Sequence, residues 1–525
     1  MLSTFGAAAQ PAFLEVASER GFLAYDMMPR GFGAGAAAAD FDDDGDVDVF
    51  LPTAHGTPHQ LYRNLGDGNF EEAAGPLGLA ETDSGRAALW FDFDGDGRLD
   101  LLVNTDCFEV SCTGAPSALR LYRQGSGGSF TEVTEAAGLS GAPAATEQHR
   151  SGLAAADLNG DGFLDFVTGF WMGPLKLYLN GGDGTFADVS AAAGIDDAPL
   201  GYHQPLLQDF NGDGRMDIFA TVDFTENRLW LQQAVVAGVP IFSEVAQAAG
   251  CDNAMNDMGV SLGDFDEDGK PDLYITNIFR DGLHNVLLRQ MDGGGLAFEE
   301  VSGAAGVQDG GWGWGTTFLD VDNDRWLDLA ETNGWRTNNW LHPPRLYMHQ
   351  GDTPATFVDG AALAGLTDTS WGTTLLAFDY DRDGDLDLLE TISEVGGRPD
   401  DEEVRLHENQ LNRTVGGRHY LVVRPRMPLP NSRAIGARIR VEAAGRTMSR
   451  WITAGTSYLG QEPAEAFFGL GDAGTVDRIT VSWPGGGETV LESVAVDQVM
   501  TVDYTPFFAD GFESGDTSSW SSTVP

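Results

Sequence analysis

The sequence has almost no lysine, little cysteine and no long apolar run. Only Lys176 and Lys270 are lysines, and 30 Lys and Arg residues against 80 Asp and Glu leave a formal net charge of −50. Nucleic acids and anionic membranes are poor partners for so acidic a chain. No segment approaches the ~20 apolar residues of a membrane-spanning helix, so we expect no transmembrane segment. The N-terminal MLSTFGAAAQPAF also lacks the basic start and apolar core of an export signal.

Three cysteines leave room for one local disulfide. Cys107 and Cys112 lie close together in the loop-like stretch TDCFEVSCTG, where a bond is possible in an oxidising compartment and free thiols are the alternative. Cys251 occupies a position that is Leu, Ile, Val or Phe in the sister repeats described below. We therefore interpret it as a small buried hydrophobic residue.

Three phrases recur along the chain in fixed order. The phrase Phe-x-(Glu/Asp)-x-x-x-x-x-Gly-apolar begins at Phe13, Phe70, Phe130, Phe186, Phe242, Phe298 and Phe357, with spacings of 56 to 60 residues. The phrase Asp-x-(Asp/Asn)-x-Asp-Gly-x-x-Asp follows each Phe by 22 to 27 residues. A third phrase ends each repeat: LYRN at Leu61, LYRQ at Leu121, LYLN at Leu177, LWLQ at Leu229, LLRQ at Leu287, LYMH at Leu346 and LHEN at Leu406. The chain is therefore a repeat protein.

Each repeat contains about four short β-rich runs separated by Gly, Asp and Asn, and no helix-length amphipathic stretch intervenes. Four strands per repeat of this length predict an all-β fold, a seven-bladed β-propeller with four-stranded blades over residues 1–411. A β-solenoid is the alternative, but it favours shorter periods. Residues 412–504 alternate as RIRVEA and DRITVSW and predict a small β-rich domain. Residues 505–525 form a tail that we expect to be flexible, with a sorting signal as the alternative.

The Asp-rich phrase has the chemistry of a hard-cation site. It places oxygens at positions 1, 3, 5 and 9 around a Gly at position 6, which permits a sharp turn. Ca²⁺ takes six to eight oxygens, and four side chains, the carbonyl at position 7 and water meet that demand. Turn formation alone does not require Asp at positions 1, 5 and 9 in every copy.

The predicted ligands number four in each of seven loops, and up to seven Ca²⁺ ions are expected. They are Asp40, Asp42, Asp44 and Asp48; Asp92, Asp94, Asp96 and Asp100; Asp157, Asn159, Asp161 and Asp165; Asp209, Asn211, Asp213 and Asp217; Asp264, Asp266, Asp268 and Asp272; Asp320, Asp322, Asp324 and Asp328; and Asp379, Asp381, Asp383 and Asp387. Loops three and four have one carboxylate fewer, because Asn159 and Asn211 replace Asp. Loop six has Arg325 in place of the Gly, so we expect it to be the weakest site or to stay empty.

These phrases carry a family resemblance. DFDGDGRLDLLV and DLNGDGFLDFVTGF resemble the FG-GAP and VCBS repeats of integrin α-chain propellers and bacterial surface proteins, in which the loop aspartates bind calcium structurally. The C-terminal segment resembles the ASPIC/UnbV module of cartilage acidic protein 1-like proteins. The matching residues are Asn431, Ile435-Gly436-Ala437, Phe468-Gly469-Leu470-Gly471 and Trp483-Pro484. The resemblance implies a secreted or surface protein, expected to be monomeric, that acts in adhesion or binds a protein or glycan.

A polysaccharide-active enzyme or a lectin that uses the propeller face is the alternative function. His149 and His203 precede loops three and four by eight and six residues, but no Ser-His-Asp, HExxH, P-loop or dinucleotide motif is present. We therefore expect no catalytic site. Five tryptophans also cluster late in the repeats, either as packing within the blades or as a platform for sugar or protein: Trp312, Trp314, Trp335, Trp340 and Trp371.

Overall fold

The computed structural model describes residues 11–23, 33, 35–105, 119–140, 149–195, 199–293, 295–335, 341–393, 403–414 and 418–505. Over these ranges the fold is all-β, with many four-stranded antiparallel sheets and helices of only four residues each. The all-β prediction is confirmed. Cys107, Cys112, Trp340 and most of the C-terminal tail lie outside the described residues. No helix in the described ranges is long and apolar enough to cross a membrane.

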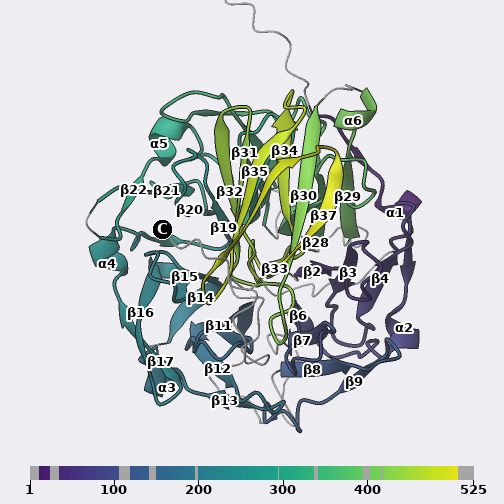
Figure 1. Ribbon diagram of the computed structural model, residues 1–525, viewed down its shortest axis with the longest axis vertical. Coiled ribbons are helices and arrows are strands. Elements are labelled where there is room, and N and C mark those ends of the chain that lie inside the picture. The colour runs from purple at the N-terminus through teal and green to yellow at the C-terminus, as the bar shows by residue number, and fades with distance from the viewer. Residues whose placement is uncertain are drawn as a thin grey trace, which may run out of the picture.

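Seven four-stranded units follow one another around the molecule (Figure 1). Unit one is β2 (Ala36–Ala39), β3 (Asp48–Leu51), β4 (Gln60–Asn64) and β5 (Phe70–Glu72). Unit two is β6 (Gly85–Phe91), β7 (Asp100–Thr105), β8 (Leu119–Gln124) and β9 (Phe130–Glu132). Unit three is β10 (Arg150–Ala156), β11 (Asp165–Gly173), β12 (Lys176–Asn180) and β13 (Phe186–Asp188). Unit four is β14 (Leu200–Gln208), β15 (Asp217–Glu226), β16 (Arg228–Val236) and β17 (Val239–Glu244), with β18 (Ala254–Asn256) paired to β15.

The other three units repeat this plan. Unit five is β19 (Val260–Gly263), β20 (Asp272–Ile275), β21 (Val286–Gln290) and β22 (Phe298–Glu300). Unit six is β23 (Gly313–Leu319), β24 (Asp328–Asn333), β25 (Arg345–His349) and β26 (Phe357–Asp359). Unit seven is β27 (Trp371–Phe378), β28 (Asp387–Ser393), β29 (Glu403–Asn409) and β1 (Phe13–Glu15). Its outer strand therefore comes from the start of the chain, with Phe13 opposite Asn409. Strand exchange between the first and last repeats closes the ring, a point that the sequence left open.

The recurring Gly of the first phrase ends a short helical turn or a loop beside the next repeat. All seven of these glycines have left-handed φ angles, from 74° at Gly138 and Gly250 to 103° at Gly21. A Cβ on Gly78 would lie 2.8 Å from the carbonyl oxygen of Phe130 in the following repeat, and one on Gly365 would lie 3.1 Å from that of Phe13. Glycine is therefore required both by the backbone angle and by the close approach of the next repeat. The helical turns are α1 (Ala17–Arg20), α2 (Ala74–Leu77), α3 (Ser190–Ala193), α4 (Ala246–Ala249) and α5 (Ser302–Ala305).

The C-terminal region forms two sheets that cross one face of the ring (Figure 1). Its elements are α6 (Leu411–Thr414), β30 (His419–Arg426), β31 (Arg438–Ala443), β32 (Arg446–Trp451), β33 (Gly460–Gln461), β34 (Ala466–Gly471), β35 (Val476–Ser482), β36 (Glu488–Val494) and β37 (Gln498–Asp503). Strands β34, β30 and β37 form one sheet, and β32, β31, β35 and β36 form the other. A large apolar core joins these strands to units two and three, with Ile439 and Val481 packed in the same cluster as Leu89 and Phe166.

Residues 454–462 of this region, here called the plug segment, pass through the centre of the ring. Strand β33 pairs in parallel with β2, and Tyr458 is fully buried. The plug segment contacts every unit: Ala454 bridges Ala155, Ser457 bridges Val260, Leu459 binds Gln204, Gln461 binds Trp90, Glu462 binds Thr317, Tyr458 binds Thr374, and Gly460 lies opposite Ala36. Part of the C-terminal region therefore lies inside the ring that the repeats form.

Candidate metal centres

Each Asp-rich phrase forms the loop between the first and second strands of one unit. The Asp at position 9 begins the second strand in all seven units, as Asp48 begins β3 and Asp272 begins β20. Positions 4 and 6 both have left-handed φ angles, for example 57° at Glu267 and 84° at Gly269. Arg325 takes the position-6 angle in loop six with a φ of 81°, which a side chain with a Cβ adopts only under strain. The left-handed backbone angle at position 4 was not predicted from the sequence.

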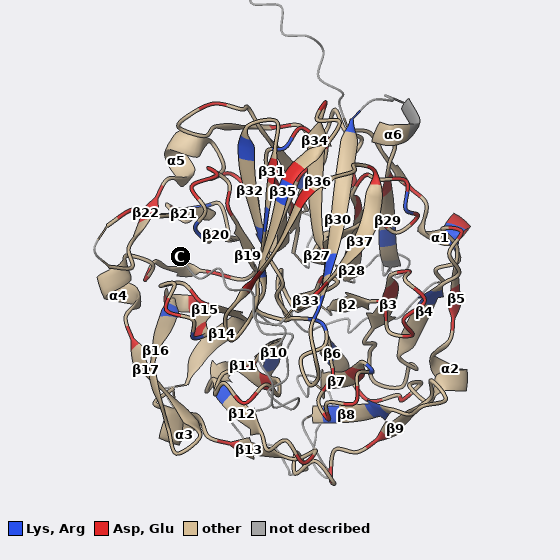
Figure 2. Ribbon diagram, viewed as in Figure 1, with Lys and Arg blue, Asp and Glu red and all other residues tan. Residues whose placement is uncertain are grey.

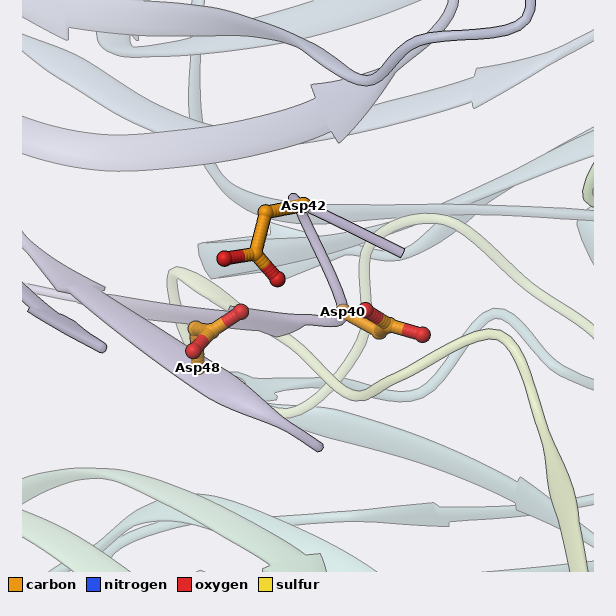
Figure 3. A group of neighbouring side chains, drawn as sticks. All are labelled: Asp40, Asp42 and Asp48. Atoms are coloured by element: carbon orange, nitrogen blue, oxygen red, sulfur yellow. The ribbon is translucent and has the colours of Figure 1, made fainter. Parts of the chain in front are cut away.

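Five of the loops bring three carboxylates together so that one oxygen from each lies within 4.8 Å of the others. The groups are Asp40, Asp42 and Asp48; Asp92, Asp94 and Asp96; Asp264, Asp266 and Asp272; Asp320, Asp322 and Asp328; and Asp379, Asp381 and Asp387. Figure 3 shows the first of these groups, with the carboxylates of Asp42 and Asp40 at the loop and that of Asp48 on the adjoining strand.

The donor set fits a divalent calcium ion. All the gathered side-chain atoms are carboxylate oxygens, the ligands that Ca²⁺ prefers. Asp40 Oδ1 is buried without a hydrogen-bond partner among the described residues, a costly state for a carboxylate unless a cation balances it. Asp94 Oδ1 is buried in the same way, but the other oxygen of Asp94 forms an ion pair with Arg123. The loop-six group, predicted to be the weakest, is formed by three buried aspartates. Its Asp322 Oδ1 also lies 2.8 Å from Arg418 Nη1, so an arginine competes there for one carboxylate.

Loops three and four do not form such a carboxylate group among the described residues. Their position-3 residue is Asn, and its amide donates to the position-5 carboxylate: Asn159 Nδ2 lies 2.9 Å from Asp161 Oδ2, and Asn211 Nδ2 lies 2.9 Å from Asp213 Oδ2. The loop backbone is otherwise the same, because Asp157 accepts hydrogen bonds from the amides of Gly160 and Gly162. Calcium at these two loops stays a prediction.

The position-9 aspartate also accepts two backbone hydrogen bonds within its own unit. One carboxylate oxygen accepts the backbone N–H of loop position 2 at 2.9 to 3.3 Å in all seven loops. The other accepts a backbone N–H from the third strand at 2.7 to 2.8 Å. In unit five, Asp272 thus joins Phe265 to Gln290. The carboxylate holds the loop against its own sheet whether or not a metal is bound.

A second set of side chains, missed by the sequence analysis, connects neighbouring loops. The last residue of the third phrase donates its side-chain amide to the carbonyl of loop position 2 in the preceding unit, at 2.7 to 3.1 Å. The pairs are Asn64 with Tyr380, Gln124 with Phe41, Asn180 with Phe93, Gln232 with Leu158, Gln290 with Phe210 and Asn409 with Val321. The signal was present in the sequence, because six of the seven phrases end in Asn or Gln.

Unit six departs from this pattern. Its phrase ends in His349, whose Nδ1 accepts the Gly351 amide and whose ring stacks on Trp326 with centroids 4.4 Å apart. Burial lowers the pKa of His349 to about 4, so the ring is neutral at ordinary pH. The joint between units five and six therefore relies on other contacts.

The C-terminal region supplies arginines to the loop face. It contains ten of the chain's 30 Lys and Arg residues, and Figure 2 shows basic residues on the strands that cross the ring. Arg433 Nη2 lies 2.5 Å from Asp43 Oδ1, and Arg446 binds Glu267 through two nitrogens at 2.7 and 3.0 Å. Asp43 and Glu267 occupy loop position 4, which is not a predicted ligand position. In loops one and five these arginines thus bind a carboxylate that is not one of the predicted ligands.

Burial strongly perturbs the loop acids when no cation is bound. Burial raises the pKa of Asp48 to about 9, of Asp100 to about 8 and of Asp217 to about 7. The unfolded chain ionises near 3.9, so between about pH 4 and pH 9 the folded state binds more protons than the unfolded state. The stability of the metal-free protein must therefore fall as the pH rises through this window.

We expect protein stripped over a chelating resin to have a lower urea midpoint at pH 8 than at pH 5. At pH 8 calcium replaces the missing protons, so saturating calcium should raise the midpoint more at pH 8 than at pH 5. Urea unfolding at both pH values, with and without calcium, measures the effect. Equal calcium-induced shifts at the two pH values would contradict the assignment of these acids as ligands.

The histidines and tryptophans singled out in the sequence take separate places. His203 is buried, 3.9 Å from Asp223 and beside Tyr458, whereas the ring of His149 packs on Trp171. Trp314 and Trp371 are buried in the core and Trp312 and Trp335 are half-buried. Burial in a core is confirmed for the first two, but they pack in the apolar cluster that also contains Tyr458 of the plug segment. Cys251 is completely buried in an apolar cluster, as predicted.

Comparisons with known proteins agree with the repeat pattern. A model of the FG-GAP-like repeat matches residues 40–103, 105–168, 157–220 and 209–275, and the model of the ASPIC and UnbV domain matches residues 428–506. Cartilage acidic protein 1 from Homo sapiens is 32% identical over 165 residues, and that from Xenopus tropicalis is 30% identical over 165 residues. The match covers 31% of this chain and 25% of the human protein.

Two solved structures match this chain with low TM-scores. The BP39L lectin from Burkholderia pseudomallei has a TM-score of 0.39 at 11% identity, covering 69% of this chain and 93% of the lectin. YCF48 from Cyanidioschyzon merolae has a TM-score of 0.41 at 11% identity, covering 75% of this chain and 98% of YCF48. Similarity at this level carries no functional argument. The chain is therefore built from FG-GAP-like repeats followed by a C-terminal ASPIC and UnbV domain, with a distant similarity to cartilage acidic protein 1.

Proposed function

We propose that this protein is a secreted or cell-surface seven-bladed β-propeller that acts in adhesion or in recognition of a protein or glycan, with calcium as a structural element. Each four-stranded unit would be one blade. The observation that carries the proposal is the Asp-rich loop at the same place in every unit, with five carboxylate groups suited to Ca²⁺, each of which contains at least one buried aspartate. Even spacing around a ring suits a stabilising role better than a single catalytic centre does.

The loops are placed to couple calcium to the whole assembly. Each loop is joined to its own third strand by the position-9 aspartate, and six loops are joined to the next unit by an Asn or Gln side chain. Arginines of the C-terminal domain dock on loops one and five, and loop one is also among the six joined loops. A bound ion would therefore strengthen a blade, a joint between blades and an interdomain contact together. Extracellular modules bind calcium with Kd values of about 10⁻⁴ to 10⁻³ M, which suits a protein outside the cell.

Localisation tests the proposal. Cells that make the protein should release it into the medium or present it on their surface, where external trypsin removes it from intact cells in the presence of a chelator. Calcium should slow this digestion, because the loaded loops resist opening. A cytosolic marker protein is the control for lysis. Recovery of the protein only after lysis, protected from external trypsin, would contradict the extracellular role.

A further inference from the structure

The second strand of each unit runs from the Asp-rich loop to the opposite face of the ring. There, units three to six carry a large apolar residue at one equivalent position, seven residues after the position-9 aspartate: Met172, Phe224, Phe279 and Trp335. The corresponding residues in the other units are His55, Cys107 and Glu394. Four consecutive units thus carry a large apolar residue at one repeat position, near the end of the second strand that is farther from the Asp-rich loop.

Three of these side chains are exposed: Met172 is 52%, Phe224 62% and Phe279 45% accessible. We call these three residues the apolar crescent. In each case the preceding residue pairs with a segment beyond the four main strands of its own unit: Trp171 with Gly201, Asp223 with Asn256 of β18, and Ile278 with Trp312. Because side chains alternate along a strand, this pairing turns the next side chain outward into solvent. The exposure is thus built into the junction between units.

Two of the three residues are also held in a strained backbone conformation. Met172 has a φ of 61° and Phe224 a φ of 71°, the left-handed region that bulky residues avoid. Both lie at register shifts, between Trp171 and Gly173 and between Asp223 and Glu226. Such irregularities redirect side chains, and glycine would fit them without strain. Exposed apolar side chains at strained positions contribute nothing evident to folding, which points to a ligand.

The surroundings of the crescent indicate a protein partner. The rings of Trp171 and Phe224 are 6.4 Å apart, and Arg280 stacks over Trp312, which stacks on Trp335. Met, Phe, Trp and Arg are the residues enriched in protein interfaces, and methionine adapts to the shape of a partner. Separate Phe and Met side chains offer less to the flat face of a sugar than a row of indole rings does.

The charged residues of this chain indicate which charge the partner would carry. Exposed acids lie beside the crescent, two of them in ion pairs: Glu226 is two residues from Phe224, Asp281 is 90% exposed and 3.8 Å from Arg280, and Asp309 is 61% exposed and 3.6 Å from Arg345. Arg280 at 47% exposure is the exposed base next to Phe279. With a net charge of −50 on the whole chain, the field favours a positively charged partner.

We propose that the apolar crescent is a docking surface for a basic protein segment that packs aliphatic or aromatic side chains against Met172, Phe224 and Phe279. The proposal rests on the proposed role of the chain in recognition and names the chemistry of the partner. It does not depend on calcium acting at this face. Its failure would leave the calcium dependence of stability and the extracellular location untouched.

A fluorescent peptide of Lys, Leu and Phe tests the proposal, beside one peptide with Glu in place of Lys and one with Gly in place of Leu and Phe. The calcium-loaded full chain should bind the first peptide at least tenfold more tightly than either control peptide. The triple variant Met172→Gly, Phe224→Gly, Phe279→Ser should lose at least tenfold in affinity. Its urea midpoint should be unchanged or higher, because two strained positions become glycine. Leu363→Ser, at an 81% exposed position outside the crescent, should bind like the wild type.

Several results would overturn the proposal. They are no binding of the Lys peptide by the wild type, equal binding by wild type and triple variant, or equal binding of the Lys and Glu peptides. Glycans retained on an array by the wild type and not by the triple variant would assign the crescent to a sugar. Sedimentation of the wild type as a dimer and of the triple variant as a monomer would assign it to a second copy of the chain.

Discussion

Removal of calcium should destabilise the folded chain by about 10 kcal/mol. If each loop binds with a Kd near 10⁻⁴ to 10⁻³ M, a tenfold excess of calcium contributes about 1.4 kcal/mol per site, and seven sites sum to about 10 kcal/mol. For a chain of this size that is a fall in Tm of roughly 10 °C. The physical cause is the repulsion between carboxylates that are held together and partly buried, as with Asp264, Asp266 and Asp272.

Differential scanning calorimetry with and without a chelator measures this change. Magnesium at the same concentration is the matched control and should restore little, because Mg²⁺ retains water and demands a small octahedral site. A chelated protein that melts at the same temperature as the calcium-loaded protein would contradict calcium binding by the loops.

Within one loop, two aspartates should behave differently. Asp272→Ala removes a predicted calcium ligand and also leaves two buried backbone N–H groups, those of Phe265 and Gln290, without an acceptor. Each unsatisfied buried donor costs about 1 to 3 kcal/mol, so we expect a loss of about 2 to 6 kcal/mol even without calcium. Asp266→Ala removes a ligand that is half-buried and close to Asp268. Its effect should be confined to calcium-loaded protein, about 1.4 kcal/mol or less.

Urea unfolding of both variants in calcium and in chelator separates the two roles. Without calcium, Asp266→Ala should match or slightly exceed the wild type, because the substitution relieves repulsion from Asp268. If Asp272→Ala and the wild type had the same free energy of unfolding in chelator, the position-9 aspartate would act only as a ligand. Its hydrogen bonds to the third strand would then not stabilise the fold.

The local features of this fold could be predicted from the sequence because they depend on a few adjacent residues. The loops were located from Asp and Gly at fixed spacing, and the strands from short β-rich runs between them. Cys251 could be placed in the core because its six counterparts are apolar. Each of these predictions needs only the chemistry of a turn or the alternation of a strand.

Features that depend on contacts between distant residues could not be predicted in this way. The side-chain amide of Asn64 donates to the carbonyl of Tyr380, which is more than 300 residues away in the sequence. The phrase LYRN does not predict which residue accepts this hydrogen bond. The composition of the plug segment, which contains GTSYLGQE, does not predict that it lies at the centre of a ring. Its placement follows from one fully buried Tyr458 and from hydrogen bonds to several units at once.

The strand order illustrates the same limit. The sequence repeat begins at Phe13, but β1 belongs to the sheet of the last repeat, so each repeat supplies the outer strand of one unit and three strands of the next. The spacing of the sequence repeats does not reveal this offset, since any starting point along a repeat gives the same spacing. Only the pairing of Phe13 with Asn409 fixes where one unit ends and the next begins.

The central claim is that the Asp-rich loops bind calcium as structural supports, and counting the bound ions tests it most directly. Equilibrium dialysis of the full chain against millimolar calcium, with the bound metal measured by mass spectrometry, should give between five ions, one for each carboxylate group, and seven, one for each loop. The variant Asp264→Ala, Asp268→Ala should bind one ion fewer than the wild type and have a lower Tm in calcium. Absence of bound calcium, or a count that this variant leaves unchanged, would contradict the claim.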